Sequence, residues 1–348
     1  MNPYVLMTLL SSLGLGTTLT FASSHWLLAW MGLEINTLAI VPLMAQHHHP
    51  RAVEATTKYF LTQATAAAMI LFASTTNAWI TGEWDMAHMS SPIASTMVIT
   101  ALALKIGLAP MHFWMPEVLQ GLDLLTGLIL STWQKLAPLA LIMQTAHAID
   151  PLLLTTLGLM STLVGGWGGL NQTQLRKILA YSSIAHMGWM MIILQFAPQL
   201  TLLALGVYIF MTSAAFLTFK MSSVTKINSL AMAWSNNPTL TATAALVLLS
   251  LGGLPPLTGF MPKWLILQEL AKQDLPATAT IMALAALLSL YFYLRLCYAM
   301  TLTASPNTTS SITPWRIKTT QASLPLAVFT AVALGLLPVT PAALMLAT

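Results

Sequence analysis

The sequence predicts an all-α polytopic membrane protein of about eleven transmembrane helices. Of its 348 residues, 57% are hydrophobic and only 6% are charged, whereas roughly 25% are charged in a soluble domain. Strongly apolar stretches of about 20 residues recur from end to end, and each is long enough to cross a bilayer. Two of these stretches are interrupted by prolines in matching positions. No soluble domain fits anywhere in this pattern.

The expected helices follow the apolar stretches, and Gly and Pro residues mark most of the connections between them. The first stretch lacks a basic region before its apolar run, which indicates a spanning helix rather than a cleaved signal. The longest polar stretch, 305–323, is expected to be a loop. The spans are placed at 3–21, 25–45, 58–80, 93–116, 124–146, 152–170, 176–196, 200–220, 239–271, 277–303 and 323–346.

The fourth and ninth spans are the interrupted ones, reading LALKIGLAPMHFWMP (102–116) and LLSLGGLPPLTGFMP (248–262). A proline inside a helix removes a backbone hydrogen bond. In a bilayer the break persists only where protein or a polar cavity satisfies the freed groups. Such a matched pair indicates the ion path of a transporter-type fold; the alternative is two ordinary kinks and a chance match. The expected broken-helix positions are Pro110, Pro116, Gly252, Gly253, Pro255, Pro256 and Pro262.

The charged loop residues sort by side of the membrane. Most cations lie in the loops that follow even-numbered spans. By the positive-inside rule, these loops and the N-terminus are expected on the cytoplasmic or matrix side of the membrane, and the C-terminus is expected on the other side. The cations on the first side are Arg51, Lys58, Arg176, Lys177, Lys220, Lys226, Arg316 and Lys318. The opposite side holds Glu83, Asp85, Asp150, Asp274 and Lys272.

The interrupted spans lie 146 positions apart, as Pro110 and Pro256 show. The same offset carries the second, third and fifth spans onto the seventh, eighth and tenth. Five helices per repeat is an odd number, so the second copy is expected to be inverted. We therefore predict one transmembrane domain over 1–348, with a first repeat at 1–148, an inverted repeat at 149–304, and a loop and terminal helix at 305–348.

Five charged residues remain inside the expected spans: Glu34, Lys105, Lys135, Lys263 and Arg295. Each costs roughly 2.5–3.5 kcal/mol at the bilayer centre if it is unpaired. A partly desolvated lysine ammonium can lose its proton near neutral pH, so three lysines near broken backbone suit proton transfer. The alternative is that some of them reach an interface or form a structural ion pair. That alternative is preferred for Arg295, near the Tyr-rich end of its span.

Histidines are further candidates for proton transfer, because imidazole titrates near neutral pH. His112 lies between the two prolines of the first break and His186 lies in the seventh span; a hydrogen-bonded helix contact is the alternative for both. The run 47–49 is expected to be a solvated turn. The sequence contains no Cys/His cluster, paired-carboxylate site or nucleotide motif, so no metal or cofactor is expected on this chain. The glycines of 165–169 indicate close helix packing, and Cys297 is expected to fill the core.

Four segments carry a resemblance to a known family. They are EINTLAIVPLMAQHHHPRAVEATTKYFLTQA (34–64), LKIGLAPMHFWMPEVLQG (104–121), QLRKILAYSSIAHMGWM (174–190) and GGLPPLTGFMPKW (252–264). The chain resembles the subunit 2 family of mitochondrial NADH–ubiquinone oxidoreductase (respiratory complex I), an antiporter-like membrane subunit, in a vertebrate form that looks like fish. The resemblance covers essentially the whole chain.

The resemblance implies a role in coupling. It implies that NADH, FMN, iron–sulfur clusters and ubiquinone are bound by partner subunits, and that this chain moves protons. By the same resemblance, Glu34, Lys105, Lys135 and Lys263 match the family's proton-transfer residues. The implied partners are other membrane-arm subunits, including other antiporter-like ones, and membrane lipids, with no nucleic acid. The implied location is the mitochondrial inner membrane, with the N-terminus in the matrix and the C-terminus in the intermembrane space.

The mechanism expected from these residues starts at a switchable pair of Glu34 and Lys105, with Lys135 and Lys263 passing the proton along a hydrated mid-membrane path. When the two repeats are aligned, Leu251 occupies the position equivalent to Lys105, and Lys263 the position equivalent to Glu117. The two halves therefore cannot work identically. Two alternatives remain open: a stand-alone cation/proton antiporter, and a structural subunit that does not pump. The cost of buried lysines argues against the structural subunit.

Overall fold

α-Helices and short 3₁₀ turns build the computed structural model, which describes residues 2–46, 48–302, 323–340 and 342; no strand occurs in these ranges. Within these described ranges, six helices are long and apolar enough to cross a membrane, and three shorter helices are also apolar. The six are α1 (Pro3–Ala22), α2 (Trp26–Met44), α6 (Leu124–Thr145, continued by η1, Ala146–Ala148), α7 (Pro151–Gly169), α9 (Pro198–Met221) and α13 (Pro276–Thr301). The three are α4 (Pro92–Ile106), α11 (Pro238–Gly252) and α14 (Leu324–Gly335).

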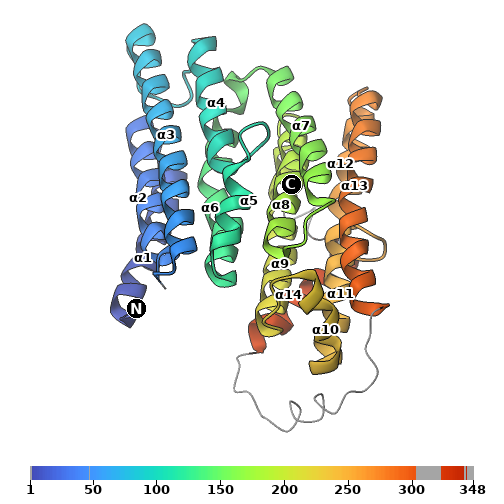
Figure 1. The fold of residues 1–348 in the computed structure, drawn as a ribbon. Coiled ribbons are helices and arrows are strands. Elements are labelled where there is room, and N and C mark those ends of the chain that lie inside the picture. Colours follow the sequence, from blue (N-terminus) through green and yellow to red (C-terminus); the bar gives the residue numbers. More distant parts are fainter. Residues whose placement is uncertain (1, 47, 303–322, 341, 343–348) are drawn as a thin grey trace. The chain divides into compact units, whose positions relative to one another are not determined.

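The chain divides into two compact units, 1–160 and 161–348, which are described separately. In the first unit α1, α2 and α3 (Pro50–Thr81) run side by side (Figure 1). A Cβ on Gly16 or Gly32 would lie 2.8 Å from the other residue's carbonyl oxygen, so glycine permits the close approach of α1 and α2. The helix α4 packs against α3 and α6, and α5 (Trp114–Gly121) packs on α3. This arrangement places both halves of the first broken span beside α3.

The second unit contains α8 (Leu175–Ile193), α9, α10 (Ile227–Asn236), α11, α12 (Phe260–Lys272), α13 and α14, followed by the 3₁₀ turn η4 (Leu337–Val339). The helix α11 packs against α9 and α13, and α12 contacts α8, α9 and α13. The glycines of 165–169 pack closely, as predicted. A Cβ on Gly165 would lie 2.7 Å from the backbone nitrogen of Ala185, and one on Gly169 would lie 2.7 Å from the Phe292 ring.

Both predicted breaks are present. The helix α4 ends at Ile106 and α5 begins at Trp114, while α11 ends at Gly252 and α12 begins at Phe260. Each first half is closed by a glycine in the left-handed region, Gly107 (φ 84°) and Gly253 (φ 79°). Glycine adopts this conformation without steric cost, which explains why it ends both helices. The Ala109–Pro110 and Pro255–Pro256 peptide bonds are cis.

Three boundaries and one additional helix differ from the sequence prediction. The terminal helix α14 ends at Gly335, well before the expected end at 346, and a 3₁₀ turn follows, because Pro338 has no amide with which to continue the helix. The third helix begins at Pro50 rather than 58, because the Nδ1 atom of His49 accepts the amide of Arg51 at its N-cap and proline suits the first turn. At 32 residues this helix is longer than a bilayer core requires. The second half of the first broken span runs to Gly121, beyond the expected end at 116. The short helix α10 was not predicted; its start is supported by the Lys226 amide, which donates to Ser229 Oγ at 3.2 Å.

Some predictions fall on residues outside the described ranges. These are His47, Arg316, Lys318, nearly all of the expected loop at 305–323, and the end of the expected terminal helix beyond 342.

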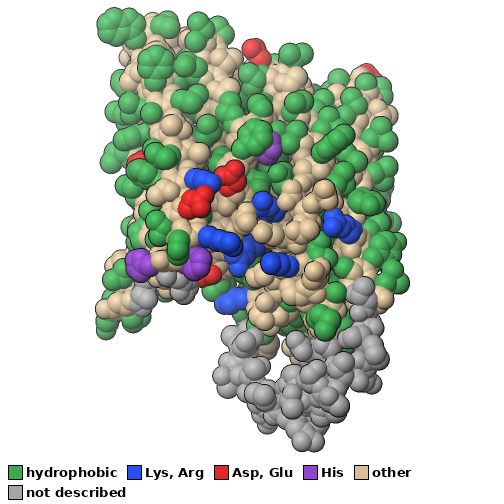
Figure 2. Space-filling model, viewed as in Figure 1, with side chains coloured by type: hydrophobic (Ala, Val, Ile, Leu, Met, Phe, Trp, Pro, Cys, Tyr) green, Lys and Arg blue, Asp and Glu red, His purple; other side chains and the backbone are tan. Residues whose placement is uncertain are grey.

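The outer surfaces of both units are rich in apolar side chains, which Figure 2 shows in green over much of the face that it draws. Trp79 is 91% exposed and Trp167 is 75% exposed. Large exposed apolar surfaces are uncommon on soluble monomers and are expected where helices face lipid. The fold therefore agrees with the composition in indicating a membrane protein.

Candidate functional site

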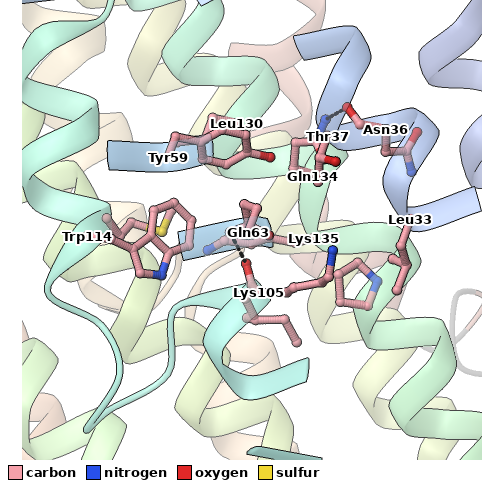
Figure 3. Close-up of a pocket in the computed structure, with 13 residues that line it drawn as sticks. Leu33, Asn36, Thr37, Tyr59, Gln63, Lys105, Trp114, Leu130, Gln134 and Lys135 are labelled. Carbon is pink, nitrogen blue, oxygen red and sulfur yellow. Dashed lines mark hydrogen bonds between the residues drawn. The ribbon is translucent and has the colours of Figure 1, made fainter. Parts of the chain in front are cut away.

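A small polar cavity lies in the first unit, between α2, α3, α6 and the broken helix α4/α5 (Figure 3). The volume in which the centre of a water molecule fits is about 10 Å³, which is about the space that one ordered water needs. Two predicted lysines, Lys105 and Lys135, face it together. The residues that line it are Leu33, Asn36, Thr37, Tyr59, Gln63, Lys105, Ile106, Trp114, Met115, Leu130, Gln134, Lys135 and Pro138.

Lys105 is held in the last turn of α4, next to the break. Its side chain is only 5% exposed, and its Nζ atom is buried with no hydrogen-bond partner. The C-terminal end of a helix carries partial negative charge, which favours a nearby cation. The break thus provides Lys105 with a helix end in the interior of the unit, where a continuous helix would have none.

Carbonyl groups at this helix end are satisfied by both side-chain and backbone donors. The indole Nε1 of Trp114 donates to the Leu104 carbonyl at 2.9 Å, and Gln63 Nε2 donates to the Lys105 carbonyl at 3.5 Å, as Figure 3 shows for Gln63. The amides of Gly107 and Leu108 both donate to the Ala103 carbonyl at 2.9 Å. The break therefore costs little in unsatisfied backbone groups, as a membrane environment requires.

Lys135 lies in the middle of α6 and is 2% exposed. Glu34 lies on α2, is partly buried, and keeps its Oε2 atom away from solvent without a hydrogen-bond partner. The carboxylate is close enough to interact electrostatically with Lys105 and Tyr59. Among the described residues, Glu34 and Lys105 do not form an ion pair, so the two predicted partners are near each other without direct contact between their charged atoms.

Several neutral polar residues of the cavity were missed in the sequence: Asn36, Thr37, Tyr59, Gln63 and Gln134. Gln134 Nε2 donates to the Asn36 carbonyl at 3.2 Å, while both side-chain polar atoms of Asn36 are buried without a partner. The amides could have been found as uncharged polar residues inside apolar spans: Gln134 is next to Lys135, and Asn36 is two residues from Glu34. These groups make the cavity polar without adding charge.

Lys263 lies in the second unit, in the first turn of α12. Its Nζ atom donates a 2.8 Å hydrogen bond to the carbonyl of Gly252, the last residue of α11. A Cβ on Gly253 would meet the Lys263 side chain at 2.8 Å, so glycine leaves space for the lysine. Lys263 therefore caps the end of the first half of the second broken helix.

The other predicted residues occupy separate places. His112 is buried in the turn of the first break, with its Nδ1 atom 3.3 Å from the Pro110 carbonyl. His186 lies on α8, with its ring centroid 5.6 Å from that of Tyr208. Arg295 donates from Nη1 to the Leu170 carbonyl at 2.6 Å, in keeping with its expected structural role.

No group of three or more His, Cys, Asp or Glu residues suited to a metal ion occurs among the described residues. Cys297 is a buried free thiol, as its position in an apolar span predicts. The charged and polar groups brought together around the cavity are two lysines, a nearby carboxylate and neutral hydrogen-bonding side chains.

Comparisons with known proteins agree on one family. A family model described as NADH:quinone oxidoreductase/Mrp antiporter, TM, matches residues 23–289, and one described as NADH dehydrogenase subunit 2 C-terminus matches 290–344. Relatives named NADH-ubiquinone oxidoreductase chain 2 are 84% identical in Carassius auratus and 77% identical in Danio rerio, each over 100% of both chains. The chain belongs to the NADH-ubiquinone oxidoreductase chain 2 family. The resemblance read from the four segments is confirmed.

Solved structures are consistent with the chain 2 family. A chain of respiratory complex I from Thermus thermophilus with bound aureothin is 29% identical, with a TM-score of 0.88, over 99% of this chain and 80% of that one. A chain of the Mrp complex from Dietzia sp. DQ12-45-1b has a TM-score of 0.83 at 15% identity, over 97% of this chain and 76% of that one. The latter similarity shows the fold alone, which is the antiporter-like fold predicted from the sequence.

Proposed function

We propose that this chain is a membrane-arm subunit of proton-translocating NADH:ubiquinone oxidoreductase, and that it couples electron transfer in partner subunits to proton movement through its own interior. Family membership over the full chain supports the assignment to the complex. The observation that carries the proton-transfer role is Lys105, whose buried Nζ atom has no hydrogen-bond partner beside a polar cavity that Lys135 also lines.

The physical argument concerns charge in a confined space. Two ammonium groups that face one small cavity repel each other, and the repulsion is stronger where little water screens it. Glu34 supplies a negative charge within electrostatic reach of Lys105. A change in the distance between Glu34 and Lys105 would alter how firmly Lys105 holds its proton, and Lys135 is the next amine along the cavity. Lys263 then continues the path in the second unit, with His112 and His186 as additional relay groups.

The proposed topology has eleven membrane crossings in two inverted five-helix repeats and one terminal helix. Support comes from the shared offset of the broken helices: α4 starts at Pro92 and α11 at Pro238, while α5 starts at Trp114 and α12 at Phe260, each pair 146 positions apart. The loop charges favour an N-terminus in the matrix and a C-terminus in the intermembrane space of the mitochondrial inner membrane. The partners would be other membrane-arm subunits, with NADH, FMN, iron–sulfur clusters and ubiquinone bound outside this chain.

Native electrophoresis in mild detergent, with NADH oxidation measured on the same band, tests this assignment. We expect the chain in a large band that oxidises NADH. A small band without that activity, together with ion exchange by the isolated chain in vesicles, would instead support a stand-alone cation/proton antiporter.

The relay has its own test, because a structural subunit would also migrate in the large band. An assembled Lys135→Met variant that keeps the normal number of protons moved per electron would remove Lys135 from the path.

A further inference from the structure

A second group of buried polar side chains lies in the 161–348 unit, outside the cavity of Lys105 and Lys135. Ser182, Ser183 and His186 occupy neighbouring turns of α8, and both serines are completely buried. Tyr208 of α9 and Tyr293 of α13 are each only 1% exposed. The unit also buries purely apolar rings, such as Phe216 and Phe219, so these two phenols place hydroxyl groups in an interior that apolar rings largely fill.

The two tyrosines connect His186 with the second broken helix. The rings of His186 and Tyr208 lie 5.6 Å apart, and the hydroxyl of Tyr208 is hydrogen-bonded to Ser183. Tyr208 and Tyr293 are close enough to interact electrostatically. Tyr293 in turn packs on Gly252, since a Cβ at that glycine would lie 3.7 Å from its Cδ2 atom.

Gly252 is the residue whose carbonyl accepts the 2.8 Å hydrogen bond from Lys263. Tyr293 therefore lies against the group that holds the Lys263 amine. Its hydroxyl oxygen is buried, and the Ser182 hydroxyl of α8 is close enough to interact with it, although no hydrogen bond of ordinary geometry joins the two. The Tyr293 oxygen is therefore not fixed by a strong structural hydrogen bond.

We propose that Tyr208 and Tyr293 are proton-relay residues that join His186 to Lys263. In one concerted transfer, protonated His186 gives a proton to the Tyr208 oxygen, Tyr208 gives its own proton to the Tyr293 oxygen, and Tyr293 gives its own proton to the neutral amine of Lys263. Each phenol starts and ends neutral, one positive charge moves from imidazole to amine, and the reverse sequence balances equally. The serine hydroxyls of Ser182 and Ser183 lie along the same path.

This inference rests on the proposed proton-transfer function and specifies the route within the second unit. Tyr293→Phe and Tyr208→Phe/Tyr293→Phe test it in the assembled complex, with protons moved per electron measured in sealed vesicles. Tyr291→Phe is the matched control, because Tyr291 lies on the same helix and is 60% exposed. Solvent deuterium isotope effects on pumping provide a readout that a packing role would not move.

We expect Tyr293→Phe to assemble, because the phenyl ring keeps the packing on Gly252 and only the weak contact of the hydroxyl with Ser182 is lost, and we expect it to lower the proton-to-electron ratio. The double variant should lower the ratio further or equally, and the control should keep it. An isotope effect on pumping that is smaller in Tyr293→Phe than in the control would support transfer through this oxygen.

A Lys263→Met variant distinguishes failure of the tyrosine route from failure of the proposed proton-transfer function. If Lys263→Met lowers the ratio but both tyrosine variants keep it, the tyrosine route is overturned and the proposed function stands. If Lys263→Met also keeps the ratio, the proposed function itself is wrong for this unit. A loss of assembly in Tyr293→Phe would show a structural hydroxyl and would overturn the relay role.

Discussion

Lys263 reaches back from the first turn of α12 to the carbonyl of Gly252, the last residue of α11, and donates a 2.8 Å hydrogen bond. Lys105 occupies the last turn of α4 itself. The two lysines are not equivalent in the sequence repeat, yet both are associated with the C-terminal end of a first half-helix, Lys105 by its position in the last turn and Lys263 by its hydrogen bond. The partial negative charge of a helix C-terminus explains why both positions favour a cation.

The glycine beside Lys263 gives a first prediction. Gly253→Ala would put a Cβ 2.8 Å from the Lys263 side chain at a backbone φ of 79°, so it should displace the amine and add strain of about 1–3 kcal/mol. We expect faster amide hydrogen exchange at the end of α11 and a lower proton-to-electron ratio. Gly206→Ala is the control, because nothing lies within 4 Å of its Cβ and alanine favours a helix. Equal exchange rates in the two variants would contradict the steric argument.

The capping of α4 by Trp114 gives a second prediction. Trp114→Phe removes the indole donor and leaves the Leu104 carbonyl unsatisfied, which should weaken this helix end by about 1–3 kcal/mol. Amide exchange of residues 104–108 should accelerate. Trp79→Phe should leave it unchanged, since Trp79 is 91% exposed on α3. Protection that matches the unaltered chain would mean that the indole bond does not hold the break.

A third prediction concerns the surface ion pairs of Lys58, one within α3 and one that links α3 to α5. Lys58 Nζ lies 2.8 Å from Glu54 Oε1 and 2.9 Å from Glu117 Oε2, but all three side chains are substantially exposed. Solvent and salt screen such pairs, so Glu117→Gln should change stability only slightly, and the change should shrink as salt is added. Thermal unfolding of the assembled complex at low and high salt would measure this. A large effect that salt does not reduce would show that Glu117 acts through something other than this pair.

Much of the fold could be predicted because the sequence pattern expresses it directly. The paired prolines and Gly107 and Gly253 marked both breaks, and the charges of Lys105 and Lys135 stood out in apolar spans. The neutral lining of the cavity was not predicted: an amide such as Gln63 carries no charge, and whether it faces lipid or an interior depends on packing between helices. The start of α3 was missed because its first turns are polar, although Pro50 is a favourable first residue.

The hydrogen bond between Lys263 and Gly252 also could not be predicted from the sequence. The two residues are on different half-helices, and only the fold of the break brings the amine to the carbonyl. Tyr208 and Tyr293 were also missed, because they belong to different helices with no shared motif.

Protons moved per electron in an assembled Lys105→Met complex test the central claim most directly. Methionine is close to lysine in length and removes a buried ammonium that has no hydrogen-bond partner, so assembly and stability should be preserved. Lys272→Met is the control, because the Lys272 side chain is 61% exposed and pairs with nearby Glu269. The account predicts a lower ratio in Lys105→Met and a normal ratio in the control. A normal ratio in both fully assembled variants would contradict a proton path through Lys105.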